Sequence, residues 1–366
     1  MRRVRLLDLG SAPAIRSQTV YHAAARAMRP DTPDTIILVS PAQPYVCIGF
    51  HQDVEQEVDL AYCEAHGLPV VRREVGGGAV YLDQGQVFSQ WVFHEDHLPG
   101  GLERGLERQF ELYVHPLVET YRALGIDAVL RPVNDVHVAG KKIGGTGAAQ
   151  IGLARVLVGS LMFDFDKATM ARVLKVSDEK MRDKVFESLN EYMTTMREQL
   201  AEVPAREAVI SLYLEKCAQV LDAEIVSGSW TADEEAVAAR LDTEFATREW
   251  LHQKGRRRGA GVKIHEDVRV VAGAFKAPGG LVRVTATLHR GRIGDVAFSG
   301  DFTLIPAAAR ESLEEAVRGV PVDRERLTAR LDAVYREMGV SSPGLEPSHF
   351  AEAIVRAADP VNARSP

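Results

Sequence analysis

The chain contains few cysteines: Cys47, Cys63 and Cys217 are the only three among 366 residues. An odd number of widely spaced cysteines without a CxxC pair provides neither a disulfide framework nor a zinc site. The first residues carry positive charge, but no apolar stretch follows them as it would in a secretory signal. Because these features are typical of a protein in a reducing compartment, a cytoplasmic location is expected.

Long apolar runs and an excess of positive charge are also absent. No uncharged apolar run approaches the roughly 20 residues needed to cross a bilayer, so no membrane span is expected. The chain has 44 Lys and Arg against 51 Asp and Glu, a net charge of −7, whereas nucleic-acid-binding proteins usually present a basic face. We therefore expect neither a membrane nor a nucleic acid as partner.

The length and composition indicate two globular domains. A chain of 366 residues is too long for one typical core, and 46% hydrophobic with 26% charged residues is ordinary for a globular protein. The basic, glycine-spaced run 254–261 is interpreted as a linker, and the alternating apolar residues over 282–288 predict a half-buried strand beyond it. We predict a larger domain over residues 1–255 and a small α+β domain over residues 256–366.

Periodicity and turn residues predict the main elements. Helices are expected from an N-cap at Ser17 to about Met28 and over residues 102–124, and residues 167–253 are expected to be mostly helical. The expected strands cover residues 35–40, 45–50, 69–74 and 86–94, followed by a glycine-punctuated antiparallel meander over 128–166. In the small domain, a hairpin reaching Phe302 and two or three amphipathic helices are expected.

Three consecutive glycines, Gly76–Gly78, follow Arg72 and Arg73. Each glycine loses more conformational entropy on folding than another residue would, so three in a row need a physical reason. They allow successive backbone N–H groups to converge on an anion, and an arginine adds a charge-assisted fork to phosphate or carboxylate. A tight turn beside a surface ion pair is the alternative. Neither GxxxxGK[ST] nor GxGxxG occurs, which excludes the standard P-loop and Rossmann sites.

A second glycine-rich segment carries a lysine pair. Lys141 and Lys142 lie in a predicted hairpin with glycine on both sides. A lysine there could stabilise charge developing on an α-phosphate and an acyl oxygen, or both lysines could be solvated turn residues. Asn134 and Asp135 could hold a ligand amine, a base edge or Mg²⁺, or open an Asx turn. The residues by themselves leave these alternatives open.

In their order along the chain, several segments resemble the lipoate–protein ligase family, within the biotin/lipoate ligase and lipoyl/octanoyl transferase superfamily. Cys47–Gln52 resembles its hydrophobic-Ile-Gly-x-x-Gln strand end, and residues 72–83 (RREVGGGAVYLD) resemble its RRxSGGGAVxHD signature. Asn134-Asp135 with residues 140–148 (GKKIGGTGA) resembles ND…xxKKxSGSA, and residues 291–302 resemble a hairpin of the accessory domain. The ordered combination covers nearly the whole chain and is more specific than any one motif.

The resemblance implies an α+β fold with a class II synthetase/biotin-ligase-like, mixed, largely antiparallel sheet flanked by helices, plus a small α+β C-terminal domain. It implies a two-step reaction in which lipoate, or a related medium-chain acid, reacts with ATP and Mg²⁺ to form acyl-AMP. A lysine of a carrier domain then takes the acyl group. The implied acceptor belongs to a 2-oxoacid dehydrogenase E2 component, the glycine cleavage H protein or a similar protein, and the enzyme is expected to be a monomer.

The resemblance also implies the site residues. Lys142 would be catalytic, near the acyl carbonyl and the α-phosphate, and Asp135 would contact Mg²⁺. The residues expected to bind the acyl-adenylate are Arg73, Gly76, Gly77, Gly78, Ala79, Val80, Asp83, Asn134, Asp135, Gly145, Thr146 and Ala148. Val75 and Leu82 stand where the signature has serine and histidine. These two departures from the family leave the identity of the acid open.

Two alternatives remain on the same fold. An octanoyl- or lipoyl-transferase passes the acyl group through a cysteine thioester and needs a thiol near the lysine hairpin. No cysteine occurs between Lys142 and Asp166, and Cys217 lies in a predicted helix, where a buried cysteine is expected. A non-catalytic acyl-binding protein would not need Lys142. Because the GRGRxG-like loop of biotin ligase is also absent, the ATP-dependent ligase is preferred.

Overall fold

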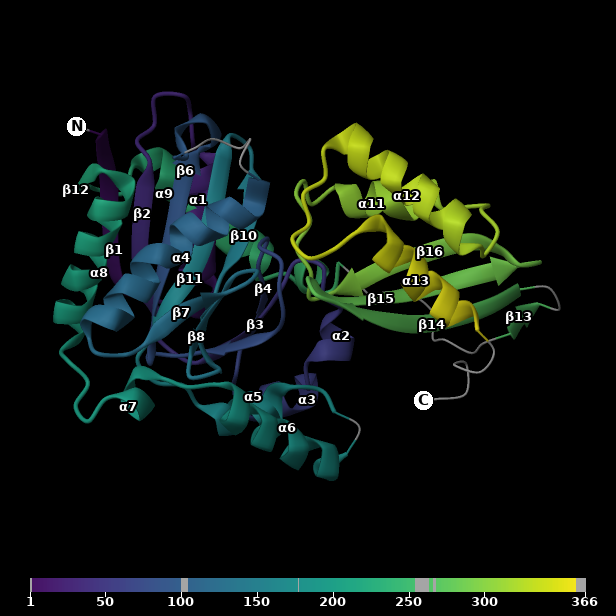
Figure 1. Ribbon diagram of the computed structural model, residues 1–366, viewed down its shortest axis with the longest axis horizontal. Coiled ribbons are helices and arrows are strands. Elements are labelled where there is room, and N and C mark those ends of the chain that lie inside the picture. The colour runs from purple at the N-terminus through teal and green to yellow at the C-terminus, as the bar shows by residue number, and fades with distance from the viewer. Residues whose placement is uncertain (1, 100–104, 177, 254–262, 266–267, 360–366) are drawn as a thin grey trace. The chain divides into compact units, whose positions relative to one another are not determined.

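The computed structural model describes residues 2–99, 105–176, 178–253, 263–265 and 268–359 (Figure 1). The chain divides into two compact units. The first comprises Met1–Ile48, Glu57–Glu74 and Ala79–Leu251, and the second comprises Gly49–Gln56, Val75–Gly78 and His252–Pro366. Two short pieces from the N-terminal part of the sequence therefore group with the C-terminal part. The predicted domain boundary at residues 255–256 and the basic run 254–261 lie outside the described residues.

A six-stranded sheet with the strand order β10-β11-β6-β2-β1-β12 forms the centre of the first unit. Its strands are β1 (Arg2–Ala12), β2 (Thr35–Pro41), β6 (Gln86–His94), β10 (Gly147–Ile151), β11 (Ala154–Met162) and β12 (Ala223–Ser227). Strand β1 pairs in parallel with β2 and β12, and all the other neighbours pair antiparallel. The predicted mixed, largely antiparallel sheet is confirmed.

Helices cover both faces of this sheet (Figure 1). They are α1 (Ala14–Arg26), α4 (Gly105–Ala123), α8 (Arg206–Leu221) and α9 (Ala232–Phe245). Successive residues of a strand point to opposite faces, as β6 illustrates. The side-chain amide of Gln90 donates to the carbonyl of Ser17 on α1 (3.0 Å), whereas Ser89 hydrogen-bonds with Tyr213 on α8 (2.6 Å). Strand β6 is therefore buried along its whole length.

Two smaller sheets complete the strands of the first unit, in the orders β4-β3-β5 and β7-β8-β9. Their strands are β3 (Tyr45–Ile48), β4 (Val70–Arg72), β5 (Val80–Leu82), β7 (Ala128–Arg131), β8 (Asp135–Val138) and β9 (Lys141–Gly145). The short helices before residue 252 are α2 (Val54–Glu57), α3 (Leu60–Ala65), η1 (Glu95–His97), α5 (Lys167–Val173), α6 (Glu179–Tyr192), α7 (Met196–Gln199) and α10 (Arg248–Leu251). The predicted meander over 128–166 is present but divided, because β10 and β11 join the large sheet.

The N-terminal part of the chain departs from the sequence prediction in two places. Helix α1 begins at Ala14 with Pro13 as its N-cap, so the prediction of Ser17 as the N-cap is wrong. Ser17 lies inside the helix, where its hydroxyl donates to the carbonyl of Ala14 (2.8 Å). Strand β1 carries no clear alternation and was not predicted. It is a strand because β2 and β12 pair with its two edges, a tertiary effect that overrides local propensity.

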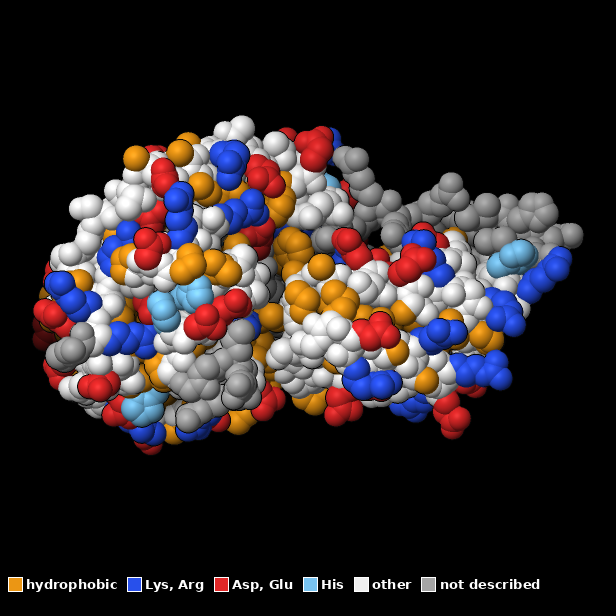
Figure 2. Space-filling view, turned by 90° about the horizontal axis from the view of Figure 1, so that it is seen from above, with side chains coloured by type: hydrophobic (Ala, Val, Ile, Leu, Met, Phe, Trp, Pro, Cys, Tyr) orange, Lys and Arg blue, Asp and Glu red, His pale blue; other side chains and the backbone are white. Residues whose placement is uncertain are grey.

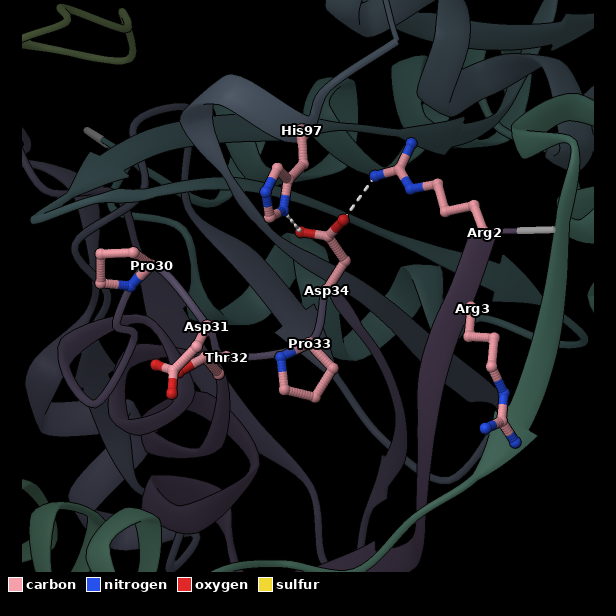
Figure 3. Close-up of a pocket in the computed structure, with 8 residues that line it drawn as sticks. All are labelled: Arg2, Arg3, Pro30, Asp31, Thr32, Pro33, Asp34 and His97. Atoms are coloured by element: carbon pink, nitrogen blue, oxygen red, sulfur yellow. Dashed lines mark hydrogen bonds and ion pairs between the residues drawn. The ribbon is translucent and has the colours of Figure 1, made fainter.

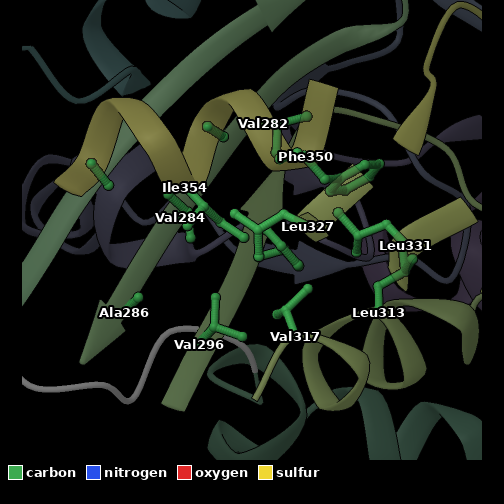
Figure 4. Packing of buried hydrophobic residues seen from close by; sticks show 14 of the residues in the cluster. Val282, Val284, Ala286, Val296, Leu313, Val317, Leu327, Leu331, Phe350 and Ile354 are labelled. Carbon is green, nitrogen blue, oxygen red and sulfur yellow. The ribbon is translucent and has the colours of Figure 1, made fainter. Parts of the chain in front are cut away.

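Besides most of α2, the second unit contains, among its described residues, a four-stranded antiparallel sheet and three helices. These elements are β13 (Lys263–His265), β14 (Val268–Ala277), β15 (Gly280–His289), β16 (Arg292–Gly300), α11 (Ala309–Ala316), α12 (Arg324–Met338) and α13 (Pro347–Ala358). The alternating apolar side chains of β15 are buried, as predicted, and pack with residues of the helices such as Leu327, Phe350 and Ile354 (Figure 4). Within the described residues, no helix is long and apolar enough to span a bilayer.

Candidate functional site

The β8–β9 hairpin brings Lys142 and Asp135 together. In the register of these strands, Asp135 pairs with Gly145 and His137 pairs with Lys142, which places the four residues on one face of the sheet. The Nζ atom of Lys142 lies 2.8 Å from Oδ1 of Asp135, and both side chains are about one-quarter exposed (27% and 22%). An ammonium group with a carboxylate beside it is thus accessible to a ligand.

Gly145 is glycine because the side chain of Lys142 occupies the adjacent space. A Cβ atom added to Gly145 would lie 2.8 Å from Nζ and 2.9 Å from Cε of Lys142, well inside a normal contact distance. At the neighbouring Gly144 the nearest atom would be the carbonyl oxygen of Ser160 at 3.7 Å, an ordinary contact. The sequence pattern shows both glycines alike, but only Gly145 makes room for the lysine.

Asn134 and Thr146 bind each other across the hairpin. The side-chain amide of Asn134 donates to the carbonyl of Thr146, and the hydroxyl and N–H of Thr146 donate to the carbonyl of Asn134 (2.8 and 3.1 Å). Both residues therefore hold the chain entering β8 next to the chain leaving β9. Ala148 follows on β10, where it is buried and pairs with Leu157.

The second carboxylate oxygen of Asp135 lies near two further polar groups. Its Oδ2 atom is 3.8 Å from Nε2 of His137 and 3.5 Å from the hydroxyl of Tyr192. His137 is buried, and its Nδ1 lies 3.1 Å from the carbonyl oxygen of Gly140 in the hairpin turn. The Nε2 atom has no hydrogen-bond partner within the described residues. Asp135 thus connects Lys142 to a buried imidazole and to the end of α6.

The two lysines of the pair have different environments. Lys141 directs its Nζ to the carbonyl of Asn190 on α6 (3.0 Å), whereas Lys142 directs its Nζ to Asp135. The backbone carbonyl of Lys142 accepts a hydrogen bond from the N–H of Thr194 (2.9 Å), so the segment after α6 runs beside β9. Of the two side chains, Lys142 is the one placed beside a carboxylate on the solvent-facing side of the sheet.

Arg72 and Arg73 also have different environments. Arg72 is fully buried, and its guanidinium donates twice to the carbonyl of Leu251 (3.1 and 2.7 Å), while Trp250 donates to the carbonyl of Arg72 (2.9 Å). Arg72 therefore anchors α10 instead of extending toward a ligand. Arg73 places Nη1 3.3 Å from the carbonyl oxygen and 3.7 Å from Sγ of Cys47.

The glycine triplet belongs to the second unit, where its backbone packs closely against other backbone. A Cβ atom on Gly76 would lie 2.6 Å from the carbonyl oxygen of Phe302 and 2.9 Å from Cα of Thr303. Gly77 has a φ of 96°, in the left-handed region that favours glycine. A Cβ atom on Gly49 would lie 1.9 Å from the carbonyl oxygen of Gly77. These contacts require glycine at positions 49, 76 and 77 whether or not an anion binds there, whereas a Cβ atom on Gly78 would have 3.7 Å to its nearest neighbour, Cβ of Asp301.

The remaining predicted residues lie around β5. Val80, the first residue of β5, pairs with Cys47 on β3, which places Val80 near Arg73. Ala79 immediately precedes β5. Asp83 accepts a hydrogen bond from the N–H of Gly85 (2.8 Å), and burial raises the pKa of this carboxyl group. Asp83 therefore closes the turn from β5 into β6. Arg73 and Val80 both have Cys47 as a neighbour, and the β8–β9 hairpin residues form a second group.

All three cysteines are buried. Burial raises the pKa of the Cys47 thiol, which Arg73 partly offsets, and it raises the pKa of Cys63 to about 11. Burial also raises the pKa of Cys217, inside α8. A thiol that forms a thioester must be accessible and partly ionised at neutral pH. None of these cysteines meets either condition, although Cys47 beside Arg73 is a neighbour that sequence reasoning missed.

A shallow pocket of about 450 Å³ lies elsewhere in the first unit (Figure 3). Its lining residues are Arg2, Arg3, Pro30, Asp31, Thr32, Pro33, Asp34 and His97. Asp34 is nearly buried and pairs with Arg2 (2.5 Å) and with Nδ1 of His97 (3.3 Å). No predicted site residue lines this pocket, and its buried carboxylate, that of Asp34, is already paired. The lysine hairpin therefore stays the candidate site.

The distribution of ionisable groups adds two observations. Figure 2 shows Lys and Arg side chains interspersed with Asp and Glu side chains, without a broad patch of either sign on that face. Within the described ranges, no group of three or more His, Cys, Asp or Glu side chains is arranged to hold a metal ion. The contact of Asp135 with Mg²⁺ thus stays a prediction that depends on oxygen ligands from the nucleotide.

Comparison of this chain with known proteins identifies one protein family that it matches. The model described as the lipoyl protein ligase A/B catalytic domain matches residues 16–218. Lipoate–protein ligase 2 of Staphylococcus aureus is 27% identical over 309 residues, which cover 80% of this chain and 84% of that relative. Octanoyltransferase LipM of Kyrpidia tusciae is 28% identical over 279 residues, which cover 69% of this chain and 100% of that relative.

Two solved structures are similar in sequence and in fold. One is a bipartite lipoate protein ligase of Thermoplasma acidophilum, described together with its E2 lipoyl domain. It is 28% identical, with a TM-score of 0.63 over 72% of this chain and 100% of that chain. The other is a lipoate–protein ligase A bound with ATP, which is 25% identical with a TM-score of 0.59 over 69% of this chain and 99% of that chain. The fold expected from the sequence is confirmed.

Proposed function

Because the chain belongs to the lipoyl protein ligase A/B catalytic domain family, we propose that it activates lipoate, or a related medium-chain acid, with ATP and joins it to a lysine of a carrier domain. The chain is an enzyme of the lipoate–protein ligase type. The observation that carries the proposal is Lys142 on the solvent-facing side of the β8–β9 hairpin, 2.8 Å from Asp135, with Gly145 leaving room for its side chain.

In the first half-reaction, a carboxylate oxygen of the acid attacks the α-phosphorus of ATP. The bond between this phosphorus and the bridging oxygen breaks, pyrophosphate leaves and acyl-AMP forms. Negative charge on the phosphate oxygens grows, and the ammonium of Lys142 stabilises it when Lys142 turns from Asp135 toward the ligand. A positive charge in contact with the reacting phosphate lowers the energy of the transition state.

Asp135 has an oxygen suited to a magnesium ion bound with the nucleotide. Its Oδ2 atom receives only a long hydrogen bond of 3.5 Å from Tyr192, so one carboxylate oxygen can turn to a cation. Mg²⁺ usually takes one or two protein carboxylates and completes its shell with phosphate oxygens and water. The ion would supply charge neutralisation on the phosphates.

In the second half-reaction, the ε-amine of the carrier lysine attacks the acyl carbonyl. The amine loses a proton, the bond from the acyl carbon to the AMP oxygen breaks, and an amide forms. Lys142 is placed to stabilise the oxyanion of this step as well. The acceptor that we propose is a lipoyl carrier domain, as the Thermoplasma relative and its E2 lipoyl domain suggest.

The experiment that tests the proposal is pyrophosphate exchange into ATP with purified protein and Mg²⁺. We expect exchange that depends on lipoate or octanoate, and a panel of acids then ranks the substrates. Val75 and Leu82 are the positions to vary if the preferred acid differs from lipoate. Absence of exchange with both acids would exclude the ligase.

Octanoyl transfer is the second candidate, because an octanoyltransferase is among the relatives. This reaction would pass through a thioester on cysteine, but all three thiols are buried and have a raised pKa. We therefore expect Cys217→Ser and Cys47→Ser to retain acid-dependent exchange. The transferase would be favoured if the wild-type protein transfers octanoate from an acyl carrier and either substitution abolishes this transfer while the fold stays intact.

A further inference from the structure

Arg131 lies on the same face of the small sheet as the Lys142–Asp135 pair. The register of β7 and β8 pairs Arg131 directly with Asp135. Paired residues of an antiparallel ladder project their side chains to the same side. Burial agrees with this assignment: Val129, two residues before Arg131, is 44% exposed, whereas Val136, next to Asp135 in sequence, is fully buried.

The positive charge of Arg131 has no acidic partner within the described residues, although a carboxylate stands opposite it. Asp135 directs Oδ1 to Lys142 at 2.8 Å, and its Oδ2 lies 3.5 Å from Tyr192. Opposite charges in directly paired positions would usually meet across the strands. Here the exposed guanidinium of Arg131 makes no ion pair or hydrogen bond in the described part of the chain. Two cations and one carboxylate therefore share this face, so its net charge is positive.

We propose that Arg131 binds the β- and γ-phosphates of the nucleotide, while Lys142 contacts the α-phosphate. This inference rests on the proposed function. Strands β7 and β9 flank β8, and Arg131 pairs with Asp135 whereas Lys142 pairs with His137, so the two positions are separated by about 12 Å at roughly 4.8 Å per strand and 3.4 Å per residue. The long side chains of Arg131 and Lys142 can reach successive phosphates over such a distance. A guanidinium also presents a planar fork that matches two phosphate oxygens.

This placement gives Arg131 a role in the departure of pyrophosphate. When the bond between the α-phosphorus and the bridging oxygen breaks, its electron pair passes to the leaving pyrophosphate. A cation already in contact with the β- and γ-phosphates stabilises that charge without any proton transfer. Arg131 is then a nucleotide-binding residue of the first half-reaction, and it has no part in the transfer of the acyl group to the carrier lysine.

The test compares Arg131→Ala and Arg131→Lys with a matched control, Arg240→Ala. Arg240 lies on α9, is exposed and also has no ion pair in the described residues. Exchange assays give KM for ATP, pyrophosphate and lipoate, calorimetry gives Kd for Mg-ATP, and synthetic lipoyl-adenylate reports the second half-reaction alone. For Arg131→Ala we expect KM for ATP and for pyrophosphate, and Kd for Mg-ATP, to rise about ten-fold, the usual effect of losing a charge-assisted hydrogen bond.

The other readouts separate this role from a structural one. In Arg131→Ala, KM for lipoate, the rate of transfer from lipoyl-adenylate and the thermal unfolding midpoint should stay at wild-type values. Arg131→Lys should recover part of the affinity for Mg-ATP. Arg240→Ala should change none of these quantities. Equal Kd values for Mg-ATP in Arg131→Ala and Arg240→Ala would overturn the inference. So would a raised KM for the carrier domain with ATP binding unchanged, which would assign Arg131 to protein docking. A wild-type enzyme that binds Mg-ATP but shows no exchange would refute the proposed function, while the Kd comparison still decides on Arg131.

Discussion

Gly76 and Gly145 belong to two glycine-rich segments that look alike in the sequence but contact different kinds of atoms. A side chain on Gly76 would meet backbone atoms of Phe302 and Thr303 at 2.6 to 2.9 Å. A side chain on Gly145 would instead meet the ammonium end of Lys142 at 2.8 Å. Backbone atoms in a packed unit can move little, whereas the end of a lysine side chain can turn away. The first glycine therefore supports the fold, and the second supports the position of the lysine that we propose to be catalytic.

The largest effect is expected for the lysine that Gly145 accommodates. We expect Lys142→Ala to lower lipoate-dependent pyrophosphate exchange by about 10³-fold, because a fixed charge on the reacting phosphate is lost. Far-UV circular dichroism and the unfolding midpoint should stay unchanged, since the side chain is partly exposed. Lys141→Ala is the control, because Lys141 contacts the carbonyl of Asn190 and not Asp135. If Lys141→Ala is the inactive variant, the assignment of the two lysines is reversed.

A substitution in the glycine triplet should act on stability. We expect Gly76→Ala to lower the free energy of unfolding by about 1–3 kcal/mol, as overpacking against backbone commonly does. Gly78→Ala is the matched control, because its Cβ would lie 3.7 Å from the nearest atom, Cβ of Asp301. Urea unfolding monitored by circular dichroism measures both variants. A Gly76→Ala variant as stable as Gly78→Ala would show that this contact is not tight in solution.

The second glycine segment should respond in the opposite way. We expect Gly145→Ala to displace Lys142 and to lower kcat for exchange by about ten-fold, which corresponds to about 1.4 kcal/mol in the activation barrier. Its unfolding free energy should stay close to the wild-type value, because the displaced group is a flexible side chain. Gly144→Ala, whose Cβ has 3.7 Å to its nearest neighbour, should keep both activity and stability. Loss of stability without loss of activity in Gly145→Ala would contradict the comparison.

The last effect is pH-dependent and concerns the entry to the triplet, where His22 accepts a hydrogen bond from the N–H of Glu74 (3.1 Å). Burial lowers the pKa of His22 to about 4, below its ordinary value of 6.5. Between pH 6.5 and 4 the unfolded chain therefore binds a proton that the folded chain does not, so stability falls as the pH falls. From pH 7 to pH 5 we expect wild type to lose about 2 kcal/mol more than His22→Gln. Parallel pH profiles for the two proteins would show that His22 titrates normally in the fold.

Elements with a strong local signal could be predicted from the sequence. The alternation over 282–288 gave a strand that is observed as β15, and the apolar run over 86–94 coincides with β6. Strand β1 could not be predicted, because its pairing partners β2 and β12 lie tens to hundreds of residues away. Ser17 has the chemistry of an N-cap, yet its helix begins three residues earlier, where Pro13 ends the preceding strand segment. Local propensity competes there with tertiary packing.

The candidate site likewise has features that could be predicted from the sequence and features that could not. The ordered motifs, the lysine pair and the absence of a cysteine between Lys142 and Asp166 are properties of the sequence, and they indicated the family and the type of reaction. The sequence could not distinguish Lys142 from Lys141, Arg73 from Arg72, or Gly145 from Gly144 by environment. Their neighbours include Asn190 and Leu251, the latter 179 residues from Arg72. Only the tertiary structure brings such residues within hydrogen-bond distance, because the packing of the chain decides which partner each of two adjacent side chains meets, such as Asn190 for Lys141 and Asp135 for Lys142.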